Sequence, residues 1–321
     1  MSKISIQMDP IELIDIKADT TFALTLEAFK RGHDLFYYNP KDLTFNNGIV
    51  TAKGKNILNI KNTINEHVQL SELETKHLSS EDVILLRQDP PFDMAYITAT
   101  HLLEHVHPKT LVVNDPLEVR NAPEKLLVTH FENLLPPTLI TSDQEEIYAF
   151  RDEHKDVIIK PLFGNGGADV FHITQGDENM SALIEMFAEK YREPIIVQRY
   201  LPEVRQGDKR IILVDGIPVG GVLRIPADGD ARANFHAGGS ALKTSLTSRE
   251  KEICEIIGPA LKSRGLLFVG IDVIGNYLTE INVTSPTGIQ EINKLDGIKI
   301  EKLIWDTIEA RLAGSSHINI I

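Results

Sequence analysis

The first third of the chain shows hydrophobic patterns that alternate between strand and helix. Phe22, Leu26 and Phe29 recur at helical spacing and Gly32 follows them as a left-handed cap would, which predicts a helix over residues 20–31. Strand and helix in alternation predict a parallel sheet covered on both faces. The other elements predicted here are strands at 3–8, 35–38, 83–86 and 111–113 and a helix at 93–106.

A turn sequence interrupts this alternation. Asn46-Asn47-Gly48 separates two short strands, 43–45 and 49–51, so a β-hairpin insertion is predicted. Together these elements predict an α/β N-terminal domain with a mostly parallel sheet over residues 1–122.

Beyond residue 123 the strands follow one another closely. Asp215-Gly216 is a two-residue hairpin signal between two of them. Hairpin-joined strands with few helices between them predict antiparallel sheets, and therefore an α+β domain over residues 123–315. Its predicted helices are 124–131, 143–154 and 300–312, and its predicted strands are 157–160, 169–173, 195–200, 209–214, 217–225, 266–274 and 277–283.

The composition narrows the class of protein. The 321 residues are 42% hydrophobic and 25% charged, enough apolar material for a large core, which excludes a disordered chain or a small disulfide scaffold. The 33 Lys and Arg against 46 Asp and Glu give a net charge of −13. Such a charge would repel nucleic acid and anionic membranes, so we expect neither as a partner.

The cysteine content and the N-terminus indicate a compartment. Cys254 is the single cysteine, so no intrachain disulfide can form, and its helical phase with Ile257 and Leu261 predicts a buried position. The first residues lack the basic-then-apolar layout of a signal peptide, and no apolar run reaches the roughly 18 residues that span a bilayer. We therefore expect a cytoplasmic protein.

Three motif matches are weak. GNGGAD at 164–169 lacks the third glycine of a dinucleotide fingerprint, and GGSALKT at 238–244 lacks the glycine before the lysine of a phosphate loop. His101, Glu104 and His105 match an inverted zinc-peptidase pattern, with two imidazoles one helical turn apart. We interpret this pattern as a solvated helical face, and a zinc peptidase stays open as an alternative.

A stronger candidate is a lysine followed by a glycine loop. Lys160 ends the apolar strand 157–160, and Gly164, Gly166 and Gly167 follow it. Glycines permit positive φ and bring successive N–H groups near an anion, while lysine supplies a point charge. The segment is predicted to fold over phosphates as a glycine-rich lid.

Oxygen-bearing side chains near the end of the same domain suggest a metal site. Asp272, Glu280 and Asn282 offer the hard oxygen ligands that magnesium prefers when it also holds phosphates. Glu280 and Asn282 share one strand face, but a plain two-residue turn at Gly275-Asn276 would place Asp272 on the other face. We therefore predict a three-residue or bulged turn there, with the glycine in the left-handed region.

Taken together, these segments resemble the ATP-grasp ligases, and within them the bacterial glutathione synthetase family. The resemblance covers nearly the whole chain, and its last segment is the most specific. The residues that carry it are MDP (8–10), LRQDPPFD (86–93), EKL (124–126), Lys160, the glycine loop, VQRYLP (197–202), GDKR (207–210), RIP (224–226), GID (270–272) and EINVTSPTG (280–288).

The resemblance implies roles for individual residues. Lys125 and Lys160 would contact ATP phosphates beneath Gly166 and Gly167, and Arg210 and Arg224 would stabilise the transferring phosphoryl group. The remaining implied roles are adenine binding by Gln198, Tyr200 and Leu201, largely through backbone groups, ribose binding by Asp208, magnesium or manganese binding by Asp272, Glu280 and Asn282, and peptide binding by Ser285, Pro286 and Thr287. Arg87 and Asp89 match another stretch of the family without an assigned role.

The implied activity is the joining of γ-glutamylcysteine to glycine with release of ADP and phosphate. A carboxylate accepts an amine poorly, so it is first converted to an acyl phosphate; this needs positioning and charge neutralisation rather than a protein nucleophile. The intermediate must be shielded from water. Residues 226–241 are predicted to be a mobile cover, with Arg232 pointing inward on closure.

One departure from the family leaves alternatives open. Family members often carry arginine directly after the paired glycines of this cover, whereas Ser240 stands here and Lys243 follows. A shifted acceptor amine, and so another ATP-grasp peptide ligase, is one alternative. A non-catalytic nucleotide-binding regulator is another. The family resemblance also implies a homo-oligomer, either a tetramer or a dimer.

Overall fold

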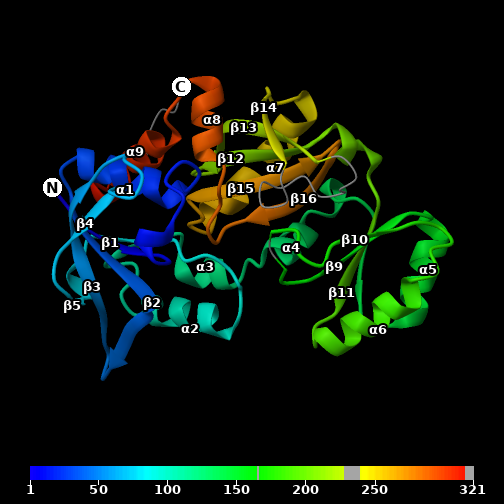
Figure 1. Cartoon of the computed structure of the whole chain (residues 1–321), viewed down its shortest axis with the longest axis horizontal. Coiled ribbons are helices and arrows are strands. Elements are labelled where there is room, and N and C mark those ends of the chain that lie inside the picture. Colours follow the sequence, from blue (N-terminus) through cyan, green and yellow to red (C-terminus); the bar gives the residue numbers. More distant parts are fainter. Residues whose placement is uncertain (165, 228–238, 315–321) are drawn as a thin grey trace.

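Three β-sheets organise the chain in a computed structural model that describes residues 1–164, 166–227 and 239–314 (Figure 1). Among the described residues these are a seven-stranded, a four-stranded and a five-stranded sheet. Figure 1 shows the N-terminal sheet at one end of the molecule, the four-stranded sheet at the other, and the five-stranded sheet between them.

The N-terminal sheet is mixed. Its strands β2, β1, β6 and β7 pair in parallel, as the alternation of strand and helix predicts. Antiparallel strands β3, β4 and β5 extend it on one side. The elements are β1 (Lys3–Gln7), α1 (Thr20–Lys30), β2 (Asp34–Asn46), β3 (Ile49–Ile60), β4 (Val68–Leu70), β5 (Glu74–His77), β6 (Val83–Leu86), α2 (Met94–Glu104), β7 (Leu111–Val113) and α3 (Pro116–Arg120).

Local chemistry fixes two of these elements. The Asp19 side chain accepts a hydrogen bond from Phe22 N and so caps the first turn of α1. Asn47 and Gly48 have φ of 49° and 86°, which gives the tight turn between β2 and β3 and confirms the predicted hairpin.

One face of the four-stranded sheet packs against helices, and the other carries predicted site residues. Val157, Ile159 and Val197 face a core built with helices α5 and α6. Because side chains alternate along a strand, Ile158 and Gln198 point the other way. The elements are α4 (Glu124–Leu127), β8 (Thr138–Thr141), α5 (Gln144–His154), β9 (Val157–Pro161), β10 (Phe171–Ile173), α6 (Met180–Lys190) and β11 (Ile195–Arg199), with sheet order β10-β9-β11-β8.

The five-stranded sheet carries the charged residues of the site. Its strands are antiparallel throughout, as predicted, with the order β14-β13-β12-β15-β16. Its elements and the helices that follow are β12 (Asp208–Val214), β13 (Ile217–Ile225), β14 (Ser240–Lys243), α7 (Ser248–Ser263), β15 (Phe268–Ile274), β16 (Tyr277–Asn282), α8 (Ile289–Asp296) and α9 (Ile300–Leu312).

A bulge in β16 brings Asp272 onto the face of Glu280. The turn Gly275-Asn276 has two residues, with Gly275 at φ 58°, and Ile274 pairs directly with Tyr277. The register then shifts, so that Asp272 stands opposite Glu280 with Thr279 as the extra residue. The predicted change of face and the left-handed glycine are confirmed, but the bulge lies within the strand instead of the turn.

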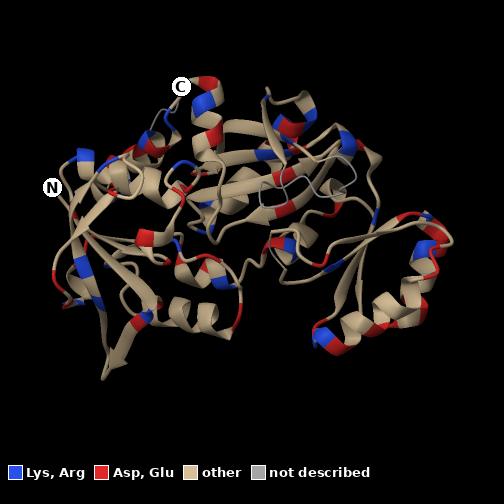
Figure 2. Cartoon of the chain, in the orientation of Figure 1, with Lys and Arg blue, Asp and Glu red and all other residues tan. Residues whose placement is uncertain are grey.

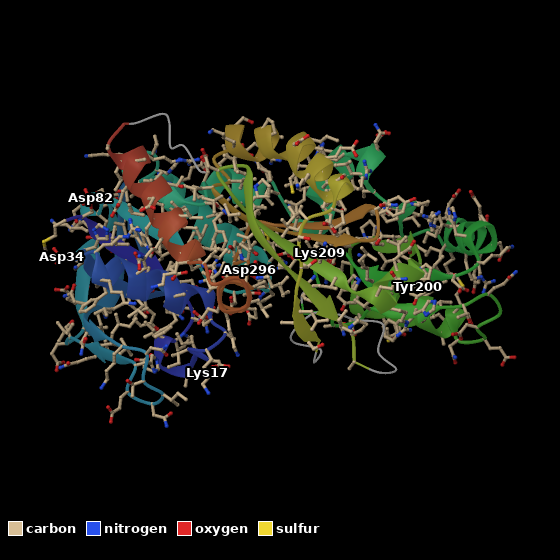
Figure 3. All side chains as sticks on the ribbon, turned by 90° about the horizontal axis from the view of Figure 1, so that it is seen from above. Lys17, Asp34, Asp82, Tyr200, Lys209 and Asp296 are labelled. Atoms are coloured by element: carbon tan, nitrogen blue, oxygen red, sulfur yellow. The ribbon has the colours of Figure 1, made fainter. Side chains whose placement is uncertain are left out.

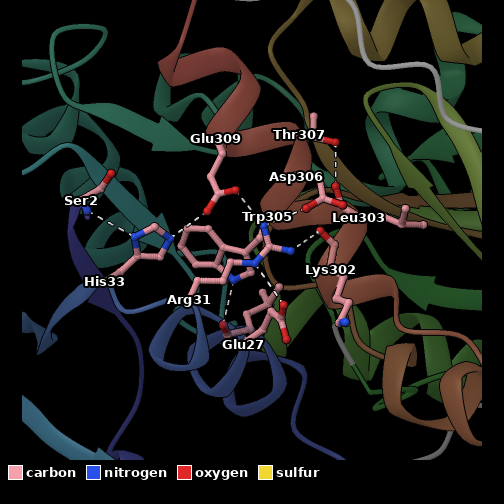
Figure 4. Close-up of polar contacts among 11 residues, drawn as sticks. Ser2, Glu27, Arg31, His33, Lys302, Leu303, Trp305, Asp306, Thr307 and Glu309 are labelled. Atoms are coloured by element: carbon pink, nitrogen blue, oxygen red, sulfur yellow. Dashed lines mark hydrogen bonds and ion pairs between the residues drawn. The ribbon is translucent and has the colours of Figure 1, made fainter.

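The C-terminal helix α9 packs against α1, at the opposite end of the sequence (Figure 4). The buried Trp305 donates its indole N–H to Leu24 O at 2.8 Å. Arg31 lies 2.8 Å from carboxylate oxygens of both Asp306 and Glu309. Helix α9 therefore completes the core around α1. Among the described residues, no helix combines the length and apolar composition needed to cross a bilayer.

Asn114 joins the N-terminal sheet to the five-stranded sheet. This buried residue follows β7, and its amide nitrogen donates to Phe268 O and Val283 O, both at 2.8 Å. Its amide oxygen accepts from Phe268 N, also at 2.8 Å. One side chain therefore satisfies three buried backbone groups, at the start of β15 and just after β16.

We expect Asn114→Ala to lower the free energy of unfolding by about 2–4 kcal/mol, because it leaves buried backbone donors and acceptors without partners. Thermal unfolding followed by circular dichroism measures the effect. Asn133→Ala, at an exposed position, is the matched control. Equal melting temperatures for the two variants would contradict the bridging role.

Candidate active site

A cavity of about 410 Å³ lies between the four-stranded and five-stranded sheets. The sequence-predicted site residues within the described part of the chain all line it, whereas Arg232 and most of segment 226–241 lie outside the described residues. The predicted residues in its wall are Lys125, Lys160, Gly166, Gly167, Gln198, Tyr200, Leu201, Asp208, Arg210, Arg224, Asp272, Glu280, Asn282, Ser285, Pro286 and Thr287.

At the centre of the cavity wall, one carboxylate lies between two guanidinium groups. Arg210 holds both oxygens of Asp272, with Nε–Oδ1 at 2.5 Å and Nη2–Oδ2 at 2.9 Å. Arg224 Nη2 lies 3.0 Å from Asp272 Oδ1 and 2.5 Å from Asp208 Oδ2. Charges of both signs therefore alternate across β12, β13 and β15, and Figure 2 shows both colours on these strands.

The absence of a side chain at Gly270 makes room for Arg210. A Cβ there would lie 3.2 Å from Arg210 Cδ and 3.0 Å from Pro286 Cβ, closer than side chains normally pack. Arg210 Nη1 donates to Thr287 O at 3.2 Å. The same arginine therefore positions the segment that carries Ser285 to Thr287 against the sheet.

The buried charges shift one another's pKa. Burial raises the pKa of Asp272, but the charges of Arg210 and Arg224 outweigh it and hold this pKa well below the ordinary value. Burial raises the pKa of Asp208 to about 6, with repulsion from Asp272 adding to the effect and Arg224 opposing it. At neutral pH both carboxylates are therefore ionised, and Asp208 is the one that gains a proton on mild acidification.

The predicted metal ligands present their oxygen atoms to one side of the sheet. Asp272 pairs with Glu280, and two residues further along the strands Gly270 pairs with Asn282. Asp272, Glu280 and Asn282 therefore lie on the same face of the sheet. Asn282 Nδ2 lies 3.4 Å from Asp272 Oδ2, and Thr279 Oγ1 donates to Asp272 O at 3.0 Å. Two carboxylates and an amide oxygen are a donor set suited to a hard divalent cation.

Two lysines line the same cavity as these carboxylates. Lys125 Nζ donates to Gly164 O and lies 3.5 Å from Glu280 Oε1. Lys160 Nζ lies 3.4 Å from Gln198 Oε1, and burial lowers its pKa. The Lys125 ammonium group therefore lies beside the glycine loop, and the Lys160 ammonium group lies beside strand β11.

The glycine loop has the backbone that its sequence predicts. Gly166 and Gly167 have φ of 61° and 75°, in the left-handed region that side chains disfavour. Both line the cavity beside Ala168. The described residues of the loop thus form one wall, although its proposed action as a lid stays a prediction.

A third wall connects the cavity to the N-terminal sheet. The buried Arg87 follows β6 and donates from Nη2 to Pro286 O and from Nε to Thr21 Oγ1, each at 3.1 Å. Ser285 Oγ donates to Arg87 O at 3.3 Å, and Asp89 lines the cavity. These contacts bring the end of β6 into the site, where the family resemblance leaves Arg87 and Asp89 without a role.

Glu124 also lines the cavity, although no motif in the sequence assigns it a role. Thr284 Oγ1 donates to Glu124 Oε1 at 3.1 Å. Burial raises the pKa of Glu124, and the negative charge of Glu280 raises it further while Lys125 opposes both. Its position directly before Lys125 in the EKL motif was the one signal available.

The zinc-peptidase pattern does not form a metal centre in the described part of the chain, where no group of three His, Cys, Asp or Glu residues could hold an ion. Glu104 is engaged by Arg120 at 2.9 Å and lies 3.9 Å from the exposed His101. The His105 ring lies against that of Phe45, with ring centroids 4.6 Å apart and planes inclined by 34°. These contacts favour the interpretation as a solvated helical face.

The raised pKa of Asp208 predicts a pH effect on stability. Its folded-state value of about 6 lies above the unfolded value of about 3.9, so the folded protein keeps a proton that the unfolded chain releases between these pH values. This contribution to stability therefore falls as pH rises from about 4 to 6. We expect the melting temperature of Asp208→Asn, relative to the unchanged protein, to rise across that window and then level off. A difference that stays constant from pH 4 to 7 would contradict the shift.

Family models identify the family of this chain, and solved structures share its fold. The model described as prokaryotic glutathione synthetase, N-terminal domain, matches residues 2–120, and the ATP-grasp domain of the same family matches residues 124–297. The solved structure of the D-cycloserine synthetase DcsG superposes with a TM-score of 0.67 at 13% identity, over 95% of this chain and 99% of that one. A structure of the ATP-grasp ligase PsnB with a minimal precursor gives 0.63 at 16% identity, covering 97% and 98%.

Curated relatives have a much higher sequence identity to this chain than these solved structures do. Glutathione synthetase of Brucella melitensis is 57% identical over 309 residues, which cover 96% of this chain and 99% of the relative. Glutathione synthetase of Vibrio cholerae is 44% identical over 318 residues, covering 98% of this chain and all of the relative. The chain thus has an ATP-grasp fold and belongs to the prokaryotic glutathione synthetase family.

Proposed function

We propose that the chain is an ATP-dependent carboxylate–amine ligase that joins γ-glutamylcysteine to glycine, forming glutathione, ADP and phosphate. The observation that carries this proposal is the convergence, in one cavity, of two lysines, two arginines and an acid–amide face. Family membership supplies the identity of the substrates.

We assign the divalent cation to Asp272, Glu280 and Asn282, whose oxygen donors fit magnesium and leave manganese as an alternative. When bound, the cation neutralises charge on the nucleotide phosphates. Asp272 also holds Arg210 and Arg224, so the cation and the guanidinium groups would share this carboxylate.

The chain's own residues perform the rest of the reaction. Lys125 and Lys160 bind the phosphates of ATP, and the carboxylate of γ-glutamylcysteine attacks the γ-phosphorus as ADP departs. Arg210 and Arg224 stabilise the charge on the transferring group and on the acyl phosphate. The amine of glycine then attacks the acyl carbon, phosphate leaves, and the amine releases a proton. Such a reaction needs positioning and charge more than a nucleophilic side chain.

The remaining predicted residues divide between the two substrates. Gln198, Tyr200 and Leu201 line the end of the cavity proposed for adenine, and Asp208 is proposed to hold the ribose. The segment Ser285-Pro286-Thr287, fixed by Arg87 and Arg210, is proposed to contact the peptide. Gly166 and Gly167 are proposed as the lid over the phosphates.

Three further assignments concern the domains, the oligomeric state and the location of the protein. We propose a boundary at residues 122–123 between an N-terminal domain and an ATP-grasp domain that extends to 315, which the two matched ranges support. We also propose a homotetramer or dimer and a cytoplasmic location. Mass measurement in solution tests the oligomeric state.

The direct test of function is phosphate release by the purified protein with ATP, magnesium, γ-glutamylcysteine and glycine. We expect release that requires all four components and a peptide product with the mass of glutathione. Release only with a different carboxylate or amine would favour another ATP-grasp peptide ligase. ADP binding without phosphate release for any acceptor would favour a nucleotide-binding regulator.

Glu280→Gln tests the cation assignment. We expect at least about a 100-fold fall in turnover with an unchanged melting temperature, because loss of one anionic ligand weakens charge neutralisation at the phosphates. The exposed Glu185→Gln on α6 is the matched control. Phosphate release near the normal rate from Glu280→Gln would refute the assignment.

A further inference from the structure

His172 lies on the cavity side of the four-stranded sheet but belongs to no predicted motif. Its neighbours on β10, Phe171 and Ile173, pack toward the core beneath the helices, so alternation directs His172 to the opposite face. There it stands in register with Ile158, which lines the cavity. His172 is therefore the direct cross-strand neighbour of a residue that lines the cavity.

The imidazole of His172 stacks on the ring of Tyr200. Their ring centroids are 3.8 Å apart and their planes differ by 19°. Figure 3 labels Tyr200, beside the strands of the four-stranded sheet. Tyr200 lines the cavity next to Leu201, so the stack supports one wall of the cavity from behind.

Two other contacts hold Tyr200, but neither sets the plane of its ring. Its backbone N–H donates to Asp156 O at 2.9 Å, and its hydroxyl accepts from Arg205 Nε at 3.1 Å. A hydrogen bond at each end leaves the ring able to rotate about its long axis. The face-to-face contact with His172 removes that freedom.

The chemical state of His172 suits stacking. Burial lowers its pKa, and the charge of Arg205 lowers it further while Asp156 opposes, so the ring is neutral near pH 7. Among the described residues its Nε2 has no hydrogen-bond partner, with Asp156 Oδ2 at 4.0 Å. Stacking on Tyr200 is therefore the main contact this side chain makes through its ring.

We infer that His172 is a positioning residue for the purine base of the nucleotide, acting by fixing the ring of Tyr200 at the base-binding end of the cavity. This inference rests on the proposed nucleotide site. It predicts that His172 affects ligands that carry the base, and not ligands that consist of phosphates alone.

Calorimetric titration of the full chain with ADP and, separately, with tripolyphosphate tests the inference. For His172→Ala we expect the Kd for ADP to rise about three- to tenfold, the size expected for one lost aromatic stack, with the Kd for tripolyphosphate unchanged. His172→Phe, which keeps a ring, should restore ADP binding. His154→Ala is the matched control, because His154 also lies against an aromatic ring, that of Phe150 with ring centroids 4.3 Å apart, but Phe150, unlike Tyr200, does not line the cavity.

A second background checks that the effect passes through Tyr200. In Tyr200→Ala, adding His172→Ala should weaken ADP binding no further. Unchanged ADP binding by His172→Ala, or an equal loss for ADP and tripolyphosphate, would overturn the inference while leaving the proposed function intact. If the unchanged protein binds no ADP, the proposed nucleotide site fails, and the role of His172 fails with it.

Discussion

The carboxylate of Asp272 is the group on which the candidate site depends. It contacts the guanidinium groups of Arg210 and Arg224, and all three side chains are buried. Two like charges this close would repel strongly where water is excluded, so the shared anion is what allows both arginines to face the cavity. Removing one member of such a buried set costs about 3–5 kcal/mol, which ties the stability of the sheet to the chemistry proposed for it.

A single extra residue places that carboxylate correctly. With a regular ladder beyond the Gly275-Asn276 turn, Asp272 and Glu280 would point to opposite faces of the sheet. The bulge at Thr279 shifts the register by one residue, and the Thr279 hydroxyl bonds to the backbone of Asp272. The face that bears the oxygen donors is therefore set by backbone geometry, before any ligand contributes.

Some parts of the structure follow from the sequence more directly than others. The apolar strand 217–225 appears unchanged as β13, and the family resemblance located most of the residues that line one cavity. Strand β4 has only three residues and β5 is polar, so neither gives a usable hydrophobic pattern, and both are held by pairing with β3 instead. The stacking of His172 on Tyr200 joins β10 to the residue that follows β11, two strands separated by β9 in the sheet, and no local pattern encodes such a contact.

The seating of α9 on α1 has a consequence for biosynthesis. The indole of Trp305 is fully enclosed and bonds to the backbone of Leu24, 281 positions earlier. A nascent chain emerging from the ribosome carries α1 long before α9 exists, so part of α1 stays exposed to water until α9 has been synthesised. The N-terminal unit therefore cannot complete its packing before then, and chaperones have an interval in which to shield that helix.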